Sequence, residues 1–257
     1  MSSNPVVSVI VPTYRRPEKL ERALASIPEA MSQSGEHNHQ TIVVDDCPEG
    51  SAFAVARRFN AQYVHKAGRD RGLSSSRNIG MSLARGQYLC FLDDDDFFLP
   101  QGLQRLLVAA QIDGVAVVFG DYQAFNTEMK ADVPLAGVTI DNLLVCNQIP
   151  VGSYVLNRGM VCRNFDVNMR SHEDWDFLLS HVTQGGFRYT SGAVVVIDKT
   201  ENYTTSNQAR RRRLFWLDFL SVYSRFPARH LSSQRTQMLA SLGIQIPENL
   251  LQFDDEI

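Results

Sequence analysis

Long apolar stretches are missing from this sequence. A helix that crosses a bilayer needs about 20 consecutive apolar residues, and no stretch of the chain approaches that length. The first residues, Met1 to Pro5, hold no basic stretch followed by an apolar one, so no secretory signal is predicted. A formal net charge of −3 at pH 7 excludes a general attraction to nucleic acid. These absences predict a cytoplasmic protein with no nucleic-acid partner.

Cysteine is scarce, and other signatures of metal or cofactor sites are absent. The four cysteines are widely separated and form no C-x-x-C pair, so we expect reduced thiols and no zinc site. The chain also lacks the G-x-G-x-x-G sequence of dinucleotide-binding enzymes. This absence disfavours a dinucleotide-dependent oxidoreductase.

The composition is that of an ordinary globular domain with a sizeable core. Of the 257 residues, 44% are hydrophobic and 21% are charged. Strand-like and helical segments alternate through the first half. The expected strands are 6–11, 41–44, 62–65, 88–92 and 115–119, and the expected helices begin at Pro17 and cover 52–59, 74–84 and 102–111. Such alternation predicts an α/β fold with an open, mostly parallel sheet between helices.

The second half of the chain is less regular. We expect helices at 172–183, 209–223 and 232–242 and a strand at 193–197. The segment 143–156 shows no clear period.

The most informative segment is a run of four aspartates, Asp93 to Asp96, directly after the apolar segment 88–92. Side chains alternate along an extended chain, so Asp93 and Asp95 would point to one side and Asp94 and Asp96 to the other. Ionised carboxylates this close repel one another. A divalent cation, which prefers oxygen ligands and phosphates, would relieve the repulsion. A solvated acidic turn is the alternative.

Other polar residues are expected at the same edge of the sheet. Thr13 and Tyr14 follow the first strand, and Asp45 and Asp46 follow the second. In open parallel sheets, ligands bind beyond the carboxyl ends of the strands. This convergence favours a metal–phosphate site over a solvated turn.

Four blocks of the sequence also resemble a known family. They are Ser8 to Tyr14 (SVIVPTY), Val43 to Asp46 (VVDD), Gly72 to Asn78 (GLSSSRN) followed by Gly80, and Phe91 to Asp96 (FLDDDD) followed by Pro100. In order and spacing they resemble glycosyltransferase family 2, and Glu173–Asp174–Trp175 is similar to a later acidic pair of that family. The resemblance spans about residues 6–197. It implies the GT-A fold, a Rossmann-like mixed and mostly parallel sheet flanked by helices, and sugar transfer from a nucleotide donor.

The resemblance also divides the chain. Residues 1–205 would form the GT-A domain, with a nucleotide-binding half at 1–120 and an acceptor-binding half at 121–205. Residues 206–257 would form a helical C-terminal extension.

The resemblance places the nucleotide against the first two blocks. Pro12, Thr13 and Tyr14 would flank the base and ribose, and Asp45, with Asp46 beside it, would accept a hydrogen bond from the base. A carboxylate can accept the imide N–H of uracil or thymine, so a UDP- or dTDP-sugar is expected. A turn or a helix cap is the structural alternative for the two aspartates.

The third block would border the diphosphate. Arginine offers cationic donors in a fixed geometry, so Arg71 and Arg77 are expected at the phosphates, together with Gly72 and Asn78. The serines at 74–76 could cap the following helix, whose amino end would favour an anion. A surface ion pair is the alternative for Arg71.

By the same resemblance, the acidic run supplies the metal ligands. Asp95 is expected to bind Mn²⁺ or Mg²⁺ directly, and Asp93 to act through the ribose or a metal-bound water. Asp94 lies on the nucleotide side at a position that the family varies, where we expect a structural or solvated role. The cation would neutralise the leaving diphosphate.

Asp174 is the candidate general base, with Glu173 beside it. A base has to reach the acceptor hydroxyl on the side opposite the diphosphate, and such an in-line displacement would invert the anomeric centre. The structural alternative is that both acids simply favour the first turn of a helix.

The chain departs from the family in two places. Many members carry an Arg-x-His segment after the last strand, but 198–206 contains no histidine, so a metal or phosphate contact from that segment is in doubt. Processive synthases carry Gln-x-x-Arg-Trp, whereas Gln208 to Arg212 lacks the tryptophan. We therefore expect a single, non-processive addition to a glycan or a lipid-linked acceptor.

A basic cluster precedes an apolar segment near the C-terminus. Arg210 to Arg213 lead into Leu214 to Leu217. Through 209–223 this cluster could touch the inner face of an anionic membrane. A solvated helix face over a buried stripe is the alternative.

Two other functions account for part of the sequence. A phosphatase-like phosphotransferase also places Asp-x-Asp at a strand end near Mg²⁺, but Thr or Val follows there, where this chain has Phe97. That function would also leave block 72–78 unexplained. A non-catalytic nucleotide-sugar-binding module would lack the base, whereas Asp174 is present.

Overall fold

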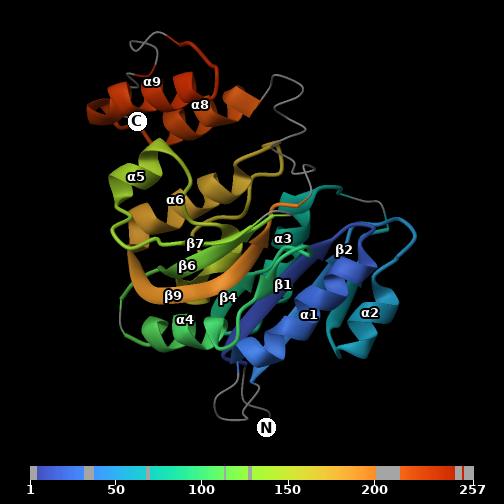
Figure 1. Ribbon diagram of the computed structural model, residues 1–257. Helices are drawn as coiled ribbons and strands as arrows, with labels where there is room; N and C mark the ends of the chain where they lie inside the picture. The colour runs from blue at the N-terminus through green and yellow to red at the C-terminus, as the bar shows by residue number, and fades with distance from the viewer. Residues whose placement is uncertain are drawn as a thin grey trace.

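The structure is a mixed sheet covered by helices on both faces (Figure 1). It is a computed structural model and describes residues 5–31, 38–67, 70–112, 114–126, 129–200, 215–246 and 251. The predicted α/β class is therefore confirmed.

The sheet has the strand order β3-β2-β1-β4-β8-β6-β9-β5, with β7 paired to β6. The strands are β1 Val7–Thr13, β2 His39–Asp45, β3 Gln62–His65, β4 Tyr88–Phe91, β5 Phe97–Phe98, β6 Val117–Phe125, β7 Lys130–Val133, β8 Tyr154–Asn157 and β9 Phe187–Asp198. Among the described strands, β1, β2, β3, β4, β6 and β9 run in one direction and β5, β7 and β8 run against them. The mostly parallel character is thus confirmed.

The helices lie on both sides of this sheet (Figure 1). They are α1 Pro17–Met31, α2 Phe53–Arg58, α3 Leu73–Leu83, α4 Gly102–Ala110, α5 Ile140–Val145, α6 Glu173–Gly185, α8 Phe215–Arg225 and α9 Ser232–Ser241, with short 3-10 turns at Val151–Ser153, Arg158–Met160 and Arg229–Leu231. In the described part of the chain, no helix has the length and apolarity needed to pass through a bilayer.

Alternation along the buried strands builds two cores. In β1, Val9 and Val11 belong to the core that includes α1, α2 and α4, whereas Ile10 points to the opposite face, lies against Gly80 of α3 and belongs to the core that includes α6 and α8. This is the period of two that a strand imposes, and burial on both faces explains its continuous apolar run. The candidate site lies at the carboxyl ends of the parallel strands of this sheet.

Several sequence-based boundaries differ from those of the structure. β6 and β9 are longer than the predicted strands, because each extends into polar residues at the sheet's second half. The segment 143–156 contains the end of α5 and the strand β8. The serines at 74–76 are buried within α3, and none caps it: the N-cap is Gly72, with φ of +117°. Of the predicted helix 209–223, residues 209–214 lie outside the described residues, and α8 begins at Phe215.

The C-terminal helices α8 and α9 stack on α5 and α6 (Figure 1). Phe219 and Tyr223 of α8 lie edge to face with Trp175 of α6, with ring centroids 5.3 and 5.8 Å apart. The aromatic residues share one core with β1 and β4. The C-terminal extension therefore packs directly on the helix that carries Asp174.

Candidate active site

The carboxyl ends of β1, β2 and β4 lie next to one another. β1 and β2 pair in parallel with Thr13 opposite Asp45. Leu92, just beyond β4, donates its N–H to the carbonyl of Ile10 in β1 at 3.0 Å. The structure thus brings the polar ends of three strands to one edge, where the alternation of elements predicts them.

The acidic run forms a turn instead of continuing β4. Asp96 donates its N–H to the carbonyl of Asp93 at 3.1 Å, so the extended geometry does not persist. The side chains still separate into two pairs. Asp93 and Asp95 keep 31% and 24% of their side-chain surface exposed, whereas Asp94 and Asp96 are buried. Only the first pair can meet a ligand.

Asp94 ties the acidic turn to the end of β1. Its Oδ2 accepts hydrogen bonds from Thr13 Oγ1 at 2.7 Å and from the N–H of Tyr14 at 3.4 Å. Burial raises the pKa of Asp94 to about 6, against the hydrogen bond from Thr13 and with the help of the charge on Asp95. Asp94 is therefore buried and bonded to Thr13 in the structure, as the structural alternative for Asp94 expects.

Asp96 ties the same turn to the end of β9. It accepts the N–H of Asp198 at 2.9 Å. Burial, followed by the charges of Asp93 and Asp95, raises the pKa of Asp96 well above its ordinary value. The buried pair thus anchors the turn on two sides and leaves Asp93 and Asp95 at the surface.

Asp93 and Asp95 fit a hard divalent cation. Burial and the neighbouring charge of Asp93 raise the pKa of Asp95, and a cation beside the two carboxylates would remove that repulsion. The described residues contain no group of three or more His, Cys, Asp or Glu side chains that could hold a metal unaided. Mg²⁺ commonly binds through one or two carboxylates plus substrate phosphates. In this structure Arg16 Nη1 lies 2.9 Å from Asp95 Oδ2.

Arg77 lies inside the protein instead of facing a diphosphate. Its side chain is 2% exposed, with Nη2 at 2.8 Å from Asp93 Oδ1 and Nη1 at 3.0 Å from Glu173 Oε1. Both terminal nitrogens are therefore engaged by carboxylates. The structure therefore does not support the predicted phosphate contact of Arg77. The sequence alone could not show that two acids bind this guanidinium inside the protein.

Asn78 is also placed away from a nucleotide. Its Nδ2 donates to the carbonyl of Phe165 and its Oδ1 accepts the N–H of Phe165, both at 2.9 Å. The paired bonds hold the loop before α6 against α3. The predicted nucleotide contact of Asn78 is not supported either, because both ends of the amide are used inside the fold.

Asp45 organises the loop after β2. It is fully buried and accepts hydrogen bonds from the N–H groups of Cys47 and Ala52, both at 2.9 Å, and from Tyr63 Oη at 3.0 Å. With three internal donors, Asp45 acts as the turn-stabilising residue of the structural alternative. Its predicted bond to the base would require a rearrangement of this loop.

Asp46 lies closer to the surface and joins the second block to the third. It accepts the N–H of Gly72 at 2.8 Å, and Lys66 Nζ lies 3.1 Å away. Lys66 also donates to Ser76 Oγ at 3.1 Å. Lys66 was not among the predicted site residues. Only its position directly after β3 could have indicated that it lies near the site.

Three other predicted nucleotide residues differ in exposure. Tyr14 is 44% exposed, Arg71 is exposed, and Pro12 is buried within β1. Tyr14 and Arg71 can therefore reach a ligand at the sheet edge. The buried side chain of Pro12 cannot contact a nucleotide, so Pro12 can affect the site only through the backbone conformation at the end of β1.

Glu173 begins α6 and is buried at the amino end of that helix. Burial raises the pKa of Glu173 to about 7, and the charge of Asp174 adds to the rise while Arg77 opposes it. Because it is buried and paired with Arg77, Glu173 is placed to position its neighbours. The preceding residue, His172, has φ of +60°, a left-handed conformation that sets the direction in which the helix starts.

Asp174 is the exposed member of the pair. Its Oδ1 accepts the N–H of Trp175 at 2.8 Å, and its Oδ2 accepts Asn147 Nδ2 at 3.1 Å. The carboxylate is partly accessible and has no basic side chain among its hydrogen-bond partners in the described chain. Asn147 was missed because nothing in the irregular segment 143–156 indicates that it faces Asp174.

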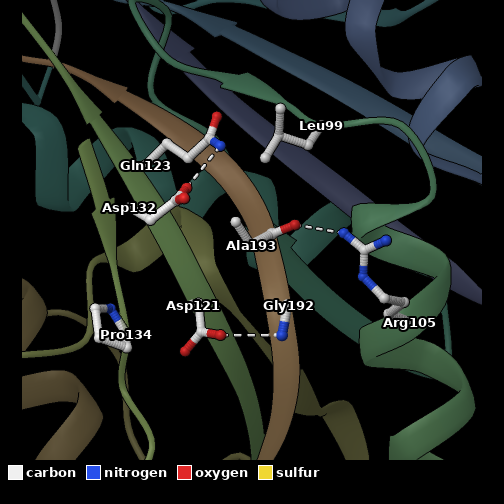
Figure 2. A pocket seen from close by; sticks show the side chains of 8 residues that line it. All are labelled: Leu99, Arg105, Asp121, Gln123, Asp132, Pro134, Gly192 and Ala193. Atoms are coloured by element: carbon white, nitrogen blue, oxygen red, sulfur yellow. Dashed lines mark hydrogen bonds between the residues drawn. The ribbon is translucent and has the colours of Figure 1, made fainter. Parts of the chain in front are cut away.

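A separate hollow of about 550 Å³ lies between α4 and strands β6, β7 and β9 (Figure 2). Gln123 donates to Asp132 at 2.8 Å and Asp121 accepts the N–H of Gly192 at 3.0 Å. None of the predicted site residues lines the hollow.

The comparison with known families agrees with this arrangement. A sequence profile described as Glycosyl transferase family 2 matches residues 8–219, a range that holds all the blocks described above. The chain belongs to glycosyl transferase family 2. The family that the sequence blocks resemble is therefore confirmed.

Proteins with similar sequences include two from bacteria. An uncharacterized glycosyltransferase of Haemophilus influenzae is 26% identical over 191 residues, which are 71% of this chain and 64% of that protein. A GalNAc(5)-diNAcBac-PP-undecaprenol beta-1,3-glucosyltransferase of Campylobacter jejuni is 33% identical over 122 residues, which are 46% of this chain and 38% of that protein. The chain thus spans less than two thirds of the length of either relative.

Solved structures establish the fold. S. aureus TarS 1-349 in complex with UDP-GlcNAc has a TM-score of 0.65 at 18% identity, over 95% of this chain and 82% of that chain. Mannosyltransferase PcManGT of Pyrobaculum calidifontis, in complex with GDP-Man and Mn²⁺, has a TM-score of 0.58 at 16% identity, over 97% and 79%. The GT-A fold expected for a family 2 member is confirmed.

Proposed function

We propose that this chain is a metal-dependent, inverting glycosyltransferase that moves one sugar from a nucleoside diphosphate donor to a hydroxyl group of an acceptor. One observation carries the proposal. Buried Arg77 links the partly exposed carboxylate of Asp93 to Glu173, the neighbour in the chain of partly exposed Asp174, and Asp95 lies in the same turn as Asp93.

The donor side lies at the carboxyl ends of β1, β2 and β4. Asp95, assisted by Asp93, would hold Mn²⁺ or Mg²⁺, which acts as a Lewis acid toward the departing diphosphate. Because Arg77 is buried, we assign the phosphates to exposed Arg71 and to Arg16, which lies beside Asp95. Tyr14 offers an exposed ring for the base. The neighbours TarS and PcManGT, solved with UDP-GlcNAc and with GDP-Man and Mn²⁺, support a nucleotide-sugar donor.

On the acceptor side, Asp174 would take the proton of the attacking hydroxyl. Its carboxylate accepts hydrogen bonds from a backbone N–H and a neutral amide, and neither of these donors is charged. Glu173, by contrast, is neutralised by Arg77. This difference favours Asp174 as the base and Glu173 as a residue that fixes its surroundings.

The acceptor is proposed to be a glycan or a lipid-linked saccharide. The name of the Campylobacter jejuni relative places its action on an undecaprenol-linked acceptor, and two further relatives are named for colanic acid and succinoglycan biosynthesis. A lipid-linked acceptor would bring this protein to the inner face of a membrane. Leu217 of α8 is 43% exposed and belongs to the segment 209–223 considered for such a contact.

A phosphotransferase is less compatible with the geometry. It would need one aspartate of the acidic turn as nucleophile, but Asp93 is paired with Arg77, Asp94 and Asp96 are buried, and Asp95 is paired with Arg16. It would also leave Asp174 without a task. Hydrolysis of p-nitrophenyl phosphate faster than any sugar transfer would favour it.

The test is a donor panel. The purified chain is incubated with Mn²⁺ and UDP-glucose, UDP-GlcNAc, dTDP-glucose or GDP-mannose, and nucleoside diphosphate release is followed with and without glycan or lipid-linked acceptors. We expect acceptor-stimulated release with a UDP- or dTDP-sugar, inversion at the anomeric carbon by NMR, and loss of metal-dependent turnover in Asp95→Ala. Donor binding without turnover across the acceptor panel would instead indicate a binding module.

A further inference from the structure

We propose that Asn147 is a positioning residue for the reaction: its amide fixes the carboxylate of Asp174, and the C-terminal helices α8 and α9 fix the segment that carries Asn147. The inference rests on the proposed role of Asp174 as base. It adds a function for the irregular segment after α5 and for the C-terminal extension.

Asp174 is held at both oxygens by neutral donors. The N–H of Trp175 reaches Oδ1 at 2.8 Å and Asn147 Nδ2 reaches Oδ2 at 3.1 Å. A hydrogen bond from a neutral amide restricts the rotation of the carboxylate without neutralising its charge. Each carboxylate oxygen has a second lone pair, so the acceptor hydroxyl can still approach.

The orientation of the Asn147 amide follows from its other bond. Asn147 Oδ1 accepts the N–H of Ile149 at 3.1 Å. A backbone N–H is always a donor, so the oxygen of the amide has to face Ile149 and the NH₂ group has to face Asp174. The amide therefore acts as a donor toward the base.

The segment that carries Asn147 is anchored at the end of α5. A helix ends with backbone carbonyls that lack partners within the helix, and here three successive carbonyls are bound by side chains from three other helices. Trp175 Nε1 of α6 reaches Leu143 O at 2.7 Å, Arg235 Nε of α9 reaches Leu144 O at 3.0 Å, and Tyr223 Oη of α8 reaches Val145 O at 2.7 Å.

The same contacts tie this anchor to the C-terminal extension. Arg235 also donates to the carbonyl of Phe226 at 2.7 Å, and its guanidinium lies 4.2 Å from the centre of the Tyr223 ring. Trp175, which follows the base in the chain, is fully buried. The C-terminal extension thus affects Asp174 in two ways. It packs against Trp175, the next residue in the chain, and it anchors the segment that carries Asn147.

Loss of the amide should change both the rate and its pH dependence. A donor to an ionised carboxylate favours the ionised form, so without Asn147 the acidic limb of the kcat–pH profile moves to higher pH. The other charged or titratable groups that act on Asp174 are Glu173, His172, Arg77 and Tyr154. All of these are retained in a variant at 147.

The experiment compares Asn147→Ala, Asn147→Asp and the control Gln148→Ala with the wild type, using the most active donor and acceptor of the panel. We expect kcat to fall by about 10- to 100-fold in Asn147→Ala, with the acidic limb displaced upward by roughly half a pH unit or more. Asn147→Asp, which keeps the shape and places a second carboxylate beside the base, should displace the limb further. Gln148→Ala should leave kcat and profile unchanged.

Binding of UDP with Mn²⁺, measured by calorimetry, should be the same in all four proteins. This readout separates positioning from misfolding, and Asn147→Asp serves if Asn147→Ala does not fold. Wild-type kcat and profile in both variants at 147 would overturn the inference while the proposed function stands. If Asp174→Asn keeps full transfer, the base assignment fails and this inference falls with it.

Discussion

The buried guanidinium of Arg77 donates a hydrogen bond of 3.0 Å to Glu173, which lies 96 residues further along the chain. Its other terminal nitrogen lies 2.8 Å from Asp93. One side chain therefore joins the proposed metal-binding turn to the helix of the proposed base. Arg77 can therefore transmit a change in geometry from the proposed metal-binding turn to the helix of the proposed base.

Replacement of Arg77 should destabilise the fold far more than it weakens donor binding directly. Arg77→Met leaves two carboxylates without their partner, and removal of one member of a buried ion pair costs about 3 to 5 kcal/mol. Arg71→Met is the matched control, since Arg71 is exposed. It should change the free energy of unfolding by less than about 0.5 kcal/mol while weakening UDP binding. Urea unfolding and calorimetry measure both effects. Equal stability of the two variants would contradict the buried role of Arg77.

Glu173→Gln should make the free energy of unfolding less dependent on pH. The folded-state pKa of Glu173, about 7, lies above its ordinary value of 4.5. The stabilisation by protonated Glu173 is therefore fully present below 4.5 and is lost as the pH rises through about 7. Between about pH 5 and 8 the variant should gain on the order of 2 kcal/mol relative to wild type, as measured by urea unfolding at each pH. A difference that stays constant over this range would show that Glu173 titrates normally.

Arg16→Gln should tighten the binding of Mn²⁺. Arg16 places a positive charge 2.9 Å from Asp95 Oδ2, where it competes with a divalent cation. Removal of this charge should increase the affinity roughly fivefold, measured by the EPR signal of free Mn²⁺. Arg15→Gln is the control, because Arg15 pairs with exposed Glu49 at 2.7 Å, and its affinity should match wild type. Weaker Mn²⁺ binding in Arg16→Gln would argue against Asp95 as the metal ligand.

Tyr223→Phe should lower kcat although Tyr223 lies in the C-terminal extension. The change removes the donor to Val145 O and leaves that carbonyl unpaired, at a cost of about 1 to 2 kcal/mol. Tyr189→Phe loses a comparable bond to Asp121, 2.9 Å long, beside the hollow of Figure 2. Both variants should unfold at lower urea concentration, but only Tyr223→Phe should turn over more slowly. An equal loss of kcat in both variants would show that Tyr223 affects turnover only through the stability of the fold.

Most of the secondary structure in the first 120 residues could be predicted from the sequence. Its strands alternate with helices, and β1 and β4 are buried along their whole length, so their apolar runs mark them clearly. The strand 62–65 has the predicted bounds, and α4 differs from its prediction by one residue. The spacing of apolar residues and the residue types at the turns are enough to predict these bounds.

The partners of the charged residues could not be predicted in the same way. Arg77 lies next to serines and Asn78 in the chain, yet its partners are 16 and 96 residues away. Asn78 meets Phe165 at a separation of 87 residues. A motif shows that a charged residue is present at a strand end, but whether it faces the ligand or a buried acid depends on contacts made only in the folded chain.

The segment 143–156 shows the same limit for backbone structure. α5 has only six residues, Ile140–Val145, too few for a helical period to appear in the sequence. Side chains of α6, α8 and α9 bind the carbonyls at its end. Asn147 could therefore be located beside Asp174 only from the structure.

The transfer rate of Asp174→Asn at saturating donor and Mn²⁺ tests the central claim most directly. The variant keeps the size of the side chain and removes its basic oxygen. We predict UDP binding equal to wild type and a transfer rate lower by about 1,000-fold or more. Transfer at the wild-type rate, with the same inverted product, would contradict the assignment of Asp174 as the base and the account of the site built on it.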